Sequence, residues 1–124
     1  MSSADAFELI GVDAGPVGGD PILRSIDLVV PANGVTVLAG PSGAGKSTLL
    51  RLLNRLDDPV SGEIRWRGRP LTEWAPTDLR RQVAMVFQRP PLFPGTVLDN
   101  LRVALADVDL ERAGHVLEHV GLDP

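Results

Sequence analysis

The sequence predicts an α/β fold with a β-rich first third, and two observations carry this prediction. Short apolar runs separated by turns fill residues 7–39, as in a sheet of short strands. Leucines at helical spacing follow at Leu49, Leu52, Leu53 and Leu56, directly after a glycine-rich loop. The order of strand, glycine loop and helix is typical of a phosphate-binding unit, so a binding site is expected where the helix begins.

The first third is expected to build a sheet beside this loop. Residues 7–12 predict a short strand, and residues 14–21 form a loop rich in glycine and proline. Residues 22–30 predict a second strand, because Ile26, Leu28 and Val30 alternate along one face.

The central motif fits the pattern of a glycine, four free residues, Gly-Lys, and then Ser or Thr. Its residues are Gly40, Pro41, Ser42, Gly43, Ala44, Gly45, Lys46, Ser47 and Thr48. An Asn33-Gly34 turn leads into residues 35–39, an apolar, β-branched run that predicts a buried strand just before the loop.

The chemistry of the motif suits phosphate groups. Its glycines free the backbone, so that successive N–H groups point at phosphate oxygens, and the new helix adds the positive end of its dipole. Lys46 supplies a full charge for the β- and γ-phosphates, and the Ser47 hydroxyl is placed to bind Mg²⁺.

The middle of the chain returns to alternating residues. Residues 63–67 predict an antiparallel strand with one solvated face, and Trp66 on that strand is expected in the core. Arg65, Arg67 and Arg69 are expected to lie on a solvated face rather than to form a phosphate or nucleic-acid site.

Two further elements precede the next loop. Thr77 is expected to cap a short helix at residues 78–82, with Asp78 favourable near the start of the helix. Residues 83–87 form a continuous apolar run that predicts a buried strand, and the run ends at Gln88.

A proline-stiffened loop begins at Arg89 and ends at Gly95, and it cannot be regular structure. Leu92 and Phe93 in this loop are open to two interpretations, a plug that folds back into the core or a contact surface. Thr96 is expected to cap a helix that runs to about residue 105.

The last helix is expected at residues 110–120, with Gly121 as its stop. His115 and His119 belong to a His-x-x-Glu-His pattern found in some zinc enzymes. They fall on the polar helix face, and a catalytic zinc needs a third protein ligand. The pattern is therefore interpreted as a solvated helix face.

Composition limits the class of protein. The chain has 124 residues, of which 44% are hydrophobic and 23% are charged, which indicates one globular domain. The net charge of −4 gives no basic surface for nucleic acid, and the absence of cysteine excludes disulfides. No secretory signal is expected at the N-terminus, and no apolar run approaches the ~20 residues that span a bilayer. A membrane role would therefore require a partner.

Taken together, these segments resemble the ATP-binding subunit of an ATP-binding cassette (ABC) transporter. The resemblance rests on residues 40–50, 59–64, 79–88 and 92–101, in the family's order, and within the family it is nearest to cassettes of phosphate-import or iron/metal-export type. It implies a P-loop NTPase fold, an ABC ATPase core of RecA-like type with an N-terminal antiparallel β subdomain. Residues 1–95 would form this subdomain and the core up to the Q-loop, and residues 96–124 would begin the helical subdomain.

The resemblance also implies roles for the site residues. The loop residues 40–48 would hold the phosphates of ATP, with Lys46 contributing to catalysis. Ser47 and Gln88 would hold Mg²⁺, and Gln88 would also lie near the attacking water. Residues 89–95 would contact a transmembrane permease subunit, which favours the contact role for Leu92 and Phe93. A second nucleotide-binding subunit and a location on the cytoplasmic face of the plasma membrane are implied as well.

Two departures from the family pattern qualify these expectations. The family stacks adenine on an aromatic residue some 30 positions before the loop lysine, where this chain has Ala14-Gly15-Pro16. Weaker base affinity and selectivity are therefore expected. The chain also stops before the signature motif, the Walker B strand with its catalytic glutamate, and the switch histidine.

For the chain alone, we therefore expect ATP binding without hydrolysis, and either marginal stability or aggregation. The leading interpretation is an ATP-hydrolysing subunit that drives a transporter. The alternatives are a truncated nucleotide-binding module without hydrolysis and an ABC-type ATPase outside transport.

Overall fold

The computed structural model describes residues 5–124. These residues divide into two compact units, and the boundary lies between Met85 and Val86. The first unit holds a four-stranded antiparallel sheet in the order β2-β1-β3-β4. Its strands are β1 (Asp5–Ala14), β2 (Leu23–Pro31), β3 (Ser61–Trp66) and β4 (Arg69–Pro70). The expected α/β class with an N-terminal antiparallel sheet is confirmed.

The sheet has one buried face, which explains the alternation in its strands. Phe7 and Leu9 on β1 are buried, as are Ile64 and Trp66 on β3, and the rings of Phe7 and Trp66 lie 4.7 Å apart. The expected core position of Trp66 is confirmed. On β2, the expected face of alternating apolar residues packs against this core.

An irregularity in β1 keeps its apolar residues on the buried face. The register of β1 shifts between Leu9 and Val12, where Gly11 has a φ of 56°. Val12 is fully buried because the shift restores the alternation beyond this bulge. Gly62 on β3 lies so close to the backbone of Ile10 and Gly11 that a Cβ at this position would collide with it.

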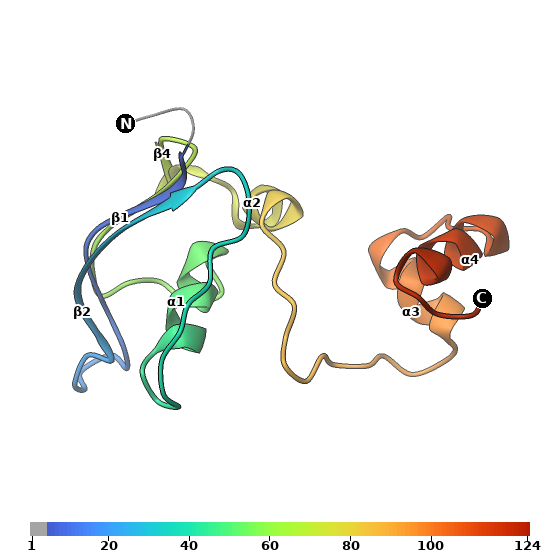
Figure 1. Cartoon of the computed structure of the whole chain (residues 1–124), viewed down its shortest axis with the longest axis horizontal. Helices are drawn as coiled ribbons and strands as arrows, with labels where there is room; N and C mark the ends of the chain where they lie inside the picture. Colours follow the sequence, from blue (N-terminus) through green and yellow to red (C-terminus); the bar gives the residue numbers. More distant parts are fainter. Residues whose placement is uncertain (1–4) are drawn as a thin grey trace. The chain divides into compact units, whose positions relative to one another are not determined.

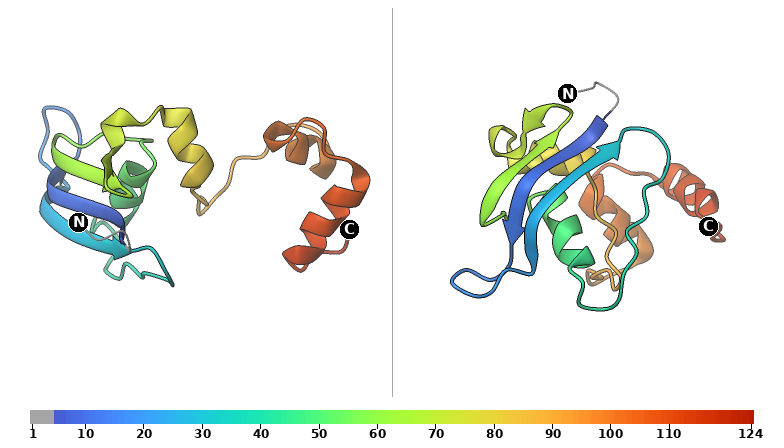
Figure 2. Two further views of the ribbon diagram at one scale, coloured as in Figure 1. Left: turned by 90° about the horizontal axis from the view of Figure 1, so that it is seen from above. Right: turned by 60° about the vertical axis from the view of Figure 1, so that its left-hand side comes forward.

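The first helix, α1 (Lys46–Leu53), covers the buried face of the sheet (Figures 1 and 2). Its Leu49 and Leu52 belong to the same buried cluster as the core residues of β1 and β3. The turn η1 (Leu71–Glu73) and the helix α2 (Pro76–Gln82) add Leu71 and Leu79 to that cluster.

The second unit contains α3 (Val97–Ala104) and α4 (Leu110–His119), which contact each other. Thr96 caps α3, as expected, and Gly121 follows α4 with a φ of 83°. Ala113 is buried on α4, whereas most of the apolar face of this helix is exposed. None of the helices in the described part of the chain is both long enough and apolar enough to cross a membrane.

Two expected strands are wrong. Residues 35–39 and residues 83–87 are not assigned to any strand, and Val35, Val37 and Val86 are 91%, 77% and 92% exposed. A strand needs a neighbour for its backbone N–H and C=O groups, and among residues 5–124 neither segment pairs with the sheet. Their apolar composition therefore does not produce a strand.

The start of α2 also differs from the expectation. Ala75 is its N-cap and Pro76 its first residue, so Thr77 lies inside the first turn and caps nothing. Proline favours this position because its fixed φ suits a helix and its missing N–H would have no helical acceptor there.

The exposed valines predict self-association of the chain. Lysine at both Val35 and Val37 is expected to shift the protein towards monomer, because charge opposes the association of extended apolar segments. Size-exclusion chromatography with light scattering measures this shift. The matched control is Val17→Lys, at a fully exposed turn position, which should leave the profile unchanged. A wild-type chain that stays monomeric at all concentrations would contradict the prediction.

Candidate functional site

The candidate site is built around the start of α1. The polypeptide takes left-handed φ values at Gly43 (84°) and Gly45 (97°), which only glycine adopts without strain. Gly45 is the N-cap of α1 and has no side chain that could cap the first amides of the helix. These N–H groups therefore remain directed out of the helix end, where an anion is stabilised by the dipole.

Packing against the sheet holds Gly45 in place. A Cβ on Gly45 would lie 2.7 Å from Cδ2 of Leu23 and 3.1 Å from Cγ2 of Ile22. Glycine at this position thus serves two purposes, a left-handed backbone and close contact with the start of β2. The glycine loop is consequently fixed to the same core as the helix.

Lys46 closes the loop. Its ammonium group donates hydrogen bonds to the backbone oxygen of Gly40 and, at 2.8 Å, to that of Pro41. The amide of Ala44 donates to the Pro41 oxygen at 3.2 Å, which forms a turn inside the loop. The lysine charge therefore lies at the mouth of the loop, on the same side as its first residues.

The loop offers hydrogen-bond donors to a nucleotide phosphate and a hydroxyl oxygen to a metal ion. The first turn of α1 has no acidic residue, so nothing in it repels an anion. Ser47 is exposed and offers a hydroxyl oxygen, a ligand that Mg²⁺ accepts. Thr48 is half-buried and faces a different surface, described next.

A hollow of about 610 Å³ lies beside Thr48. Its walls include Ala14 at the end of β1, residues 15–17 of the following turn, Ile22, and Leu52 of α1. None of the described residues that line it is aromatic. Ala14, Gly15 and Pro16, where the sequence departs from the family pattern, are thus part of its wall.

The structure brings residues 40–48 together but assigns Gln88 to the second unit. Gln88 is exposed, in a stretch that has neither helix nor strand. The expected pairing of Ser47 and Gln88 at one metal ion therefore stays a prediction. His115 and His119, on α4, are both exposed, in agreement with a polar helix face.

A second candidate surface lies in the loop of residues 89–95. Leu92 is 86% exposed and Phe93 52% exposed, so neither is buried within the second unit. The carboxamide of Asn100 holds the loop: it accepts from the Phe93 amide at 2.9 Å and donates to the oxygens of Phe93 (3.0 Å) and Thr96 (2.9 Å). This role of Asn100 could not be predicted, because no local sequence pattern distinguishes it from another polar helix residue.

A reciprocal capping box fixes the end of this loop. The Thr96 hydroxyl accepts from the Asp99 amide at 3.1 Å, and the Asp99 carboxylate accepts from the Thr96 amide at 2.8 Å. The pKa of Asp99 lies below its usual value. The hydrogen bond from the Thr96 backbone is the larger cause, and the hydrogen bond with the Thr96 side chain is the next.

Comparison with known proteins finds one matching family and several similar proteins. A family profile described as "ABC transporter" matches residues 23–124. Over 84 residues, 68% of this chain, it is 50% identical to Protein STAR1 of Oryza sativa subsp. japonica, of which the match covers 24%.

Two further relatives come from other organisms. The chain is 45% identical to the ABC multidrug transporter atrC of Emericella nidulans over 95 residues, which are 77% of this chain and 7% of that protein. It is 43% identical to the ATP-dependent lipid A-core flippase of Xylella fastidiosa over 81 residues, which are 65% of this chain and 14% of that protein. The chain thus spans about a quarter or less of the length of these relatives.

Acid is expected to loosen the start of α3. Because the folded pKa of Asp99 is depressed, its contribution to stability is fully present above the usual aspartate pKa of ~4 and is lost as the pH falls through the folded pKa. NMR titration of the Thr96 amide from pH 5 downward measures the loss. Asp99→Asn is the control, with a weaker cap that does not titrate. A Thr96 amide that responds equally in both proteins would contradict the assignment.

Proposed function

The chain belongs to the ABC transporter family, and we propose that it forms part of an ATP-binding subunit in which ATP binding and hydrolysis drive transport through a transmembrane partner. The single observation that carries this proposal is the glycine loop at the start of α1, with Gly45 left-handed and Lys46 at its mouth. Backbone amides, a helix dipole and a fixed ammonium group converge there, which is the donor set that a triphosphate requires.

Each loop residue then has a role towards ATP. The backbone of residues 40–48 surrounds the phosphates, and Lys46 exchanges its bonds to the loop carbonyls for bonds to phosphate oxygens. The Ser47 hydroxyl would be a ligand for Mg²⁺, which would supply charge neutralisation at the phosphoryl group. Gln88 would be a further ligand for this ion and would orient the attacking water.

The base has a separate place in this proposal. The hollow beside Thr48 adjoins the first turn of α1, and its wall at residues 14–17 is aliphatic. Adenine held there makes van der Waals contacts without an aromatic face. Phosphate contacts therefore dominate the affinity for the nucleotide.

The loop of residues 89–95 is proposed as the contact with a transmembrane permease subunit. The support is the exposure of Leu92 and Phe93 on a loop that Asn100 and the capping box hold in one conformation. An ordered apolar surface loses less conformational entropy on binding than a flexible one.

The remaining features follow from this assembly. Residues 1–95 would contain the β subdomain and core, and residues 96–124 would begin the helical subdomain. The subunit would work with a second nucleotide-binding subunit at the cytoplasmic face of the plasma membrane, which it reaches through the permease.

Loss of the Lys46 charge tests the proposal directly. Lys46→Ala is expected to abolish ATP binding at micromolar nucleotide, a loss of about a hundredfold, because charged hydrogen bonds to phosphate are removed. Isothermal titration calorimetry measures the affinity. Arg81→Ala, with the same charge change at an exposed position of α2, should bind as the wild type does. Normal ATP binding by Lys46→Ala would refute the proposed function.

An aromatic side chain in the hollow is expected to strengthen ATP binding. Pro16→Tyr should raise the affinity about fivefold, because a stacked aromatic pair gains on the order of 1 kcal/mol beyond its buried area. The same calorimetric titration gives the result. Pro16→Leu is the control, with added bulk but no aromatic face. An equal gain in both variants would contradict stacking, and no gain in either would exclude the base from the hollow.

A further inference from the structure

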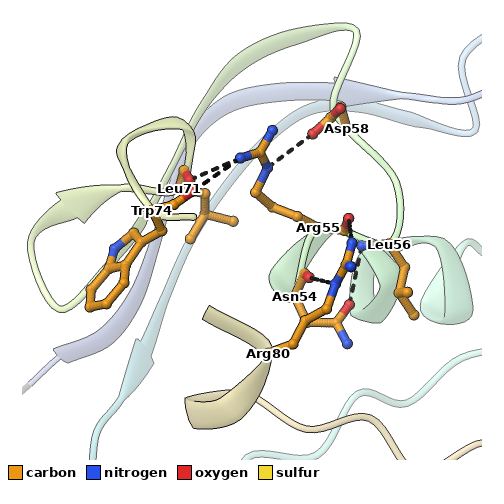
Figure 3. A network of polar contacts seen from close by, with 7 residues as sticks. All are labelled: Asn54, Arg55, Leu56, Asp58, Leu71, Trp74 and Arg80. Atoms are coloured by element: carbon orange, nitrogen blue, oxygen red, sulfur yellow. Dashed lines mark hydrogen bonds and ion pairs between the residues drawn. The ribbon is translucent and has the colours of Figure 1, made fainter. Parts of the chain in front are cut away.

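Arg80 joins the helix that carries the glycine loop to the segment that leads to Gln88. It lies on α2, and its Nε donates to the backbone oxygen of Asn54 at 3.1 Å while its Nη2 donates to that of Arg55 at 2.6 Å (Figure 3). These carbonyls lie just beyond the last residue of α1, some 25 residues earlier in the chain.

The bonds occur where a helix most needs a cation. The last carbonyls of a helix have no intrahelical donor, and they form the negative end of the helix dipole. Asn54, the C-cap of α1, is only 4% exposed. Arg80 therefore satisfies the end of α1 with a side chain from another helix.

Arg55 makes the connection at the other end of the same segment. It has a left-handed φ of 57°, and its Nη1 donates to the oxygens of Leu71 (3.5 Å) and Trp74 (3.3 Å) (Figure 3). Its Nε also pairs with Asp58 at 3.3 Å. Residues from η1 to α2 are thus attached to the end of α1 at both of their ends.

Packing adds to these hydrogen bonds. Leu49 and Leu52 of α1 and Leu79 of α2 belong to one buried cluster, so a shift of α1 is resisted by packing as well as by hydrogen bonds. The loop of residues 40–48 is at one end of α1, and α2 continues into residues 83–88.

We infer that Arg80 is a positioning residue that couples nucleotide occupancy at residues 40–48 to α2. The inference rests on the proposed ATP site. A ligand that orders the start of α1 acts on its far end through the helix, and Arg80 passes the effect to α2. Removal of its guanidinium should leave the response of α1 to the nucleotide and reduce the response of α2. It should not remove any contact to the phosphates.

Hydrogen–deuterium exchange of the 124-residue chain tests the coupling, with and without ATP and Mg²⁺. In the wild type, ATP should slow exchange in α1 and also in α2, where amides such as Val83 donate to helix carbonyls. In Arg80→Ala, the effect on α1 should remain, and the effect on α2 should fall about fivefold.

Tryptophan fluorescence gives a second readout that bulk stability does not determine. The indole of Trp66 donates to the Gln82 side chain at the end of α2, at 3.0 Å. Its emission should respond to ATP in the wild type and lose that response in Arg80→Ala. Trp74→Phe removes the other tryptophan, so that the signal comes from Trp66.

Arg81→Ala is the matched control, because Arg81 is adjacent, its side chain is 83% exposed, and it pairs only loosely with Asp78 at 3.9 Å. It should behave as the wild type. Arg80→Lys keeps the charge but cannot donate to both carbonyls as the guanidinium does, so it should lose part of the ATP-dependent protection of α2. It replaces Arg80→Ala if that variant does not fold.

The outcomes separate the two proposals. Full ATP protection of α2 in Arg80→Ala would overturn the inference, as would wild-type protection of α1 with none in α2. Failure of ATP to protect α1 in the wild type would instead refute the ATP site, and the inference would fall with it.

Discussion

Burial of α1 against the antiparallel sheet is the constraint on which the first unit depends. Leu49 and Leu52 pack among the core residues of β1 and β3, and this fixes both ends of the helix. The glycine loop is fixed at one end because Gly45 touches Leu23, and the last carbonyls are fixed at the other because Arg80 reaches them. A short helix is marginal by itself, so its tertiary packing is what makes a defined loop possible.

The antiparallel part of the fold could be predicted from the sequence because it is locally determined. Apolar and polar residues alternate in β1, β2 and β3, which indicates one buried face. Thr96 predicts the start of α3 because its side chain caps the helix. The segments at residues 35–39 and 83–87 were mispredicted for a related reason. Apolar runs indicate that a segment prefers burial, but only a paired neighbour makes it a strand.

The candidate site, like the fold, could be predicted only in part from the sequence. The loop motif of residues 40–48 is visible in the sequence because glycine, lysine and hydroxyl groups at fixed spacing have few other uses. The roles of Arg55, Arg80 and Asn100 could not be predicted, since each depends on which carbonyls the fold brings within reach. Long cationic side chains on a helix look alike in a sequence whether they bind a distant backbone oxygen, as Arg80 does, or lie in solvent, as Arg81 does.

The bonds from Lys46 to the loop carbonyls have a kinetic consequence. They draw the beginning and the end of the loop together, so part of the entropy of ordering the glycines is spent before any anion arrives. Such a loop is preorganised, because binding of an anion requires only that Lys46 exchange its acceptors. No segment has to fold. Association should then approach the rate set by diffusion and charge, and differences in affinity between loop variants should appear mainly in how long the anion stays.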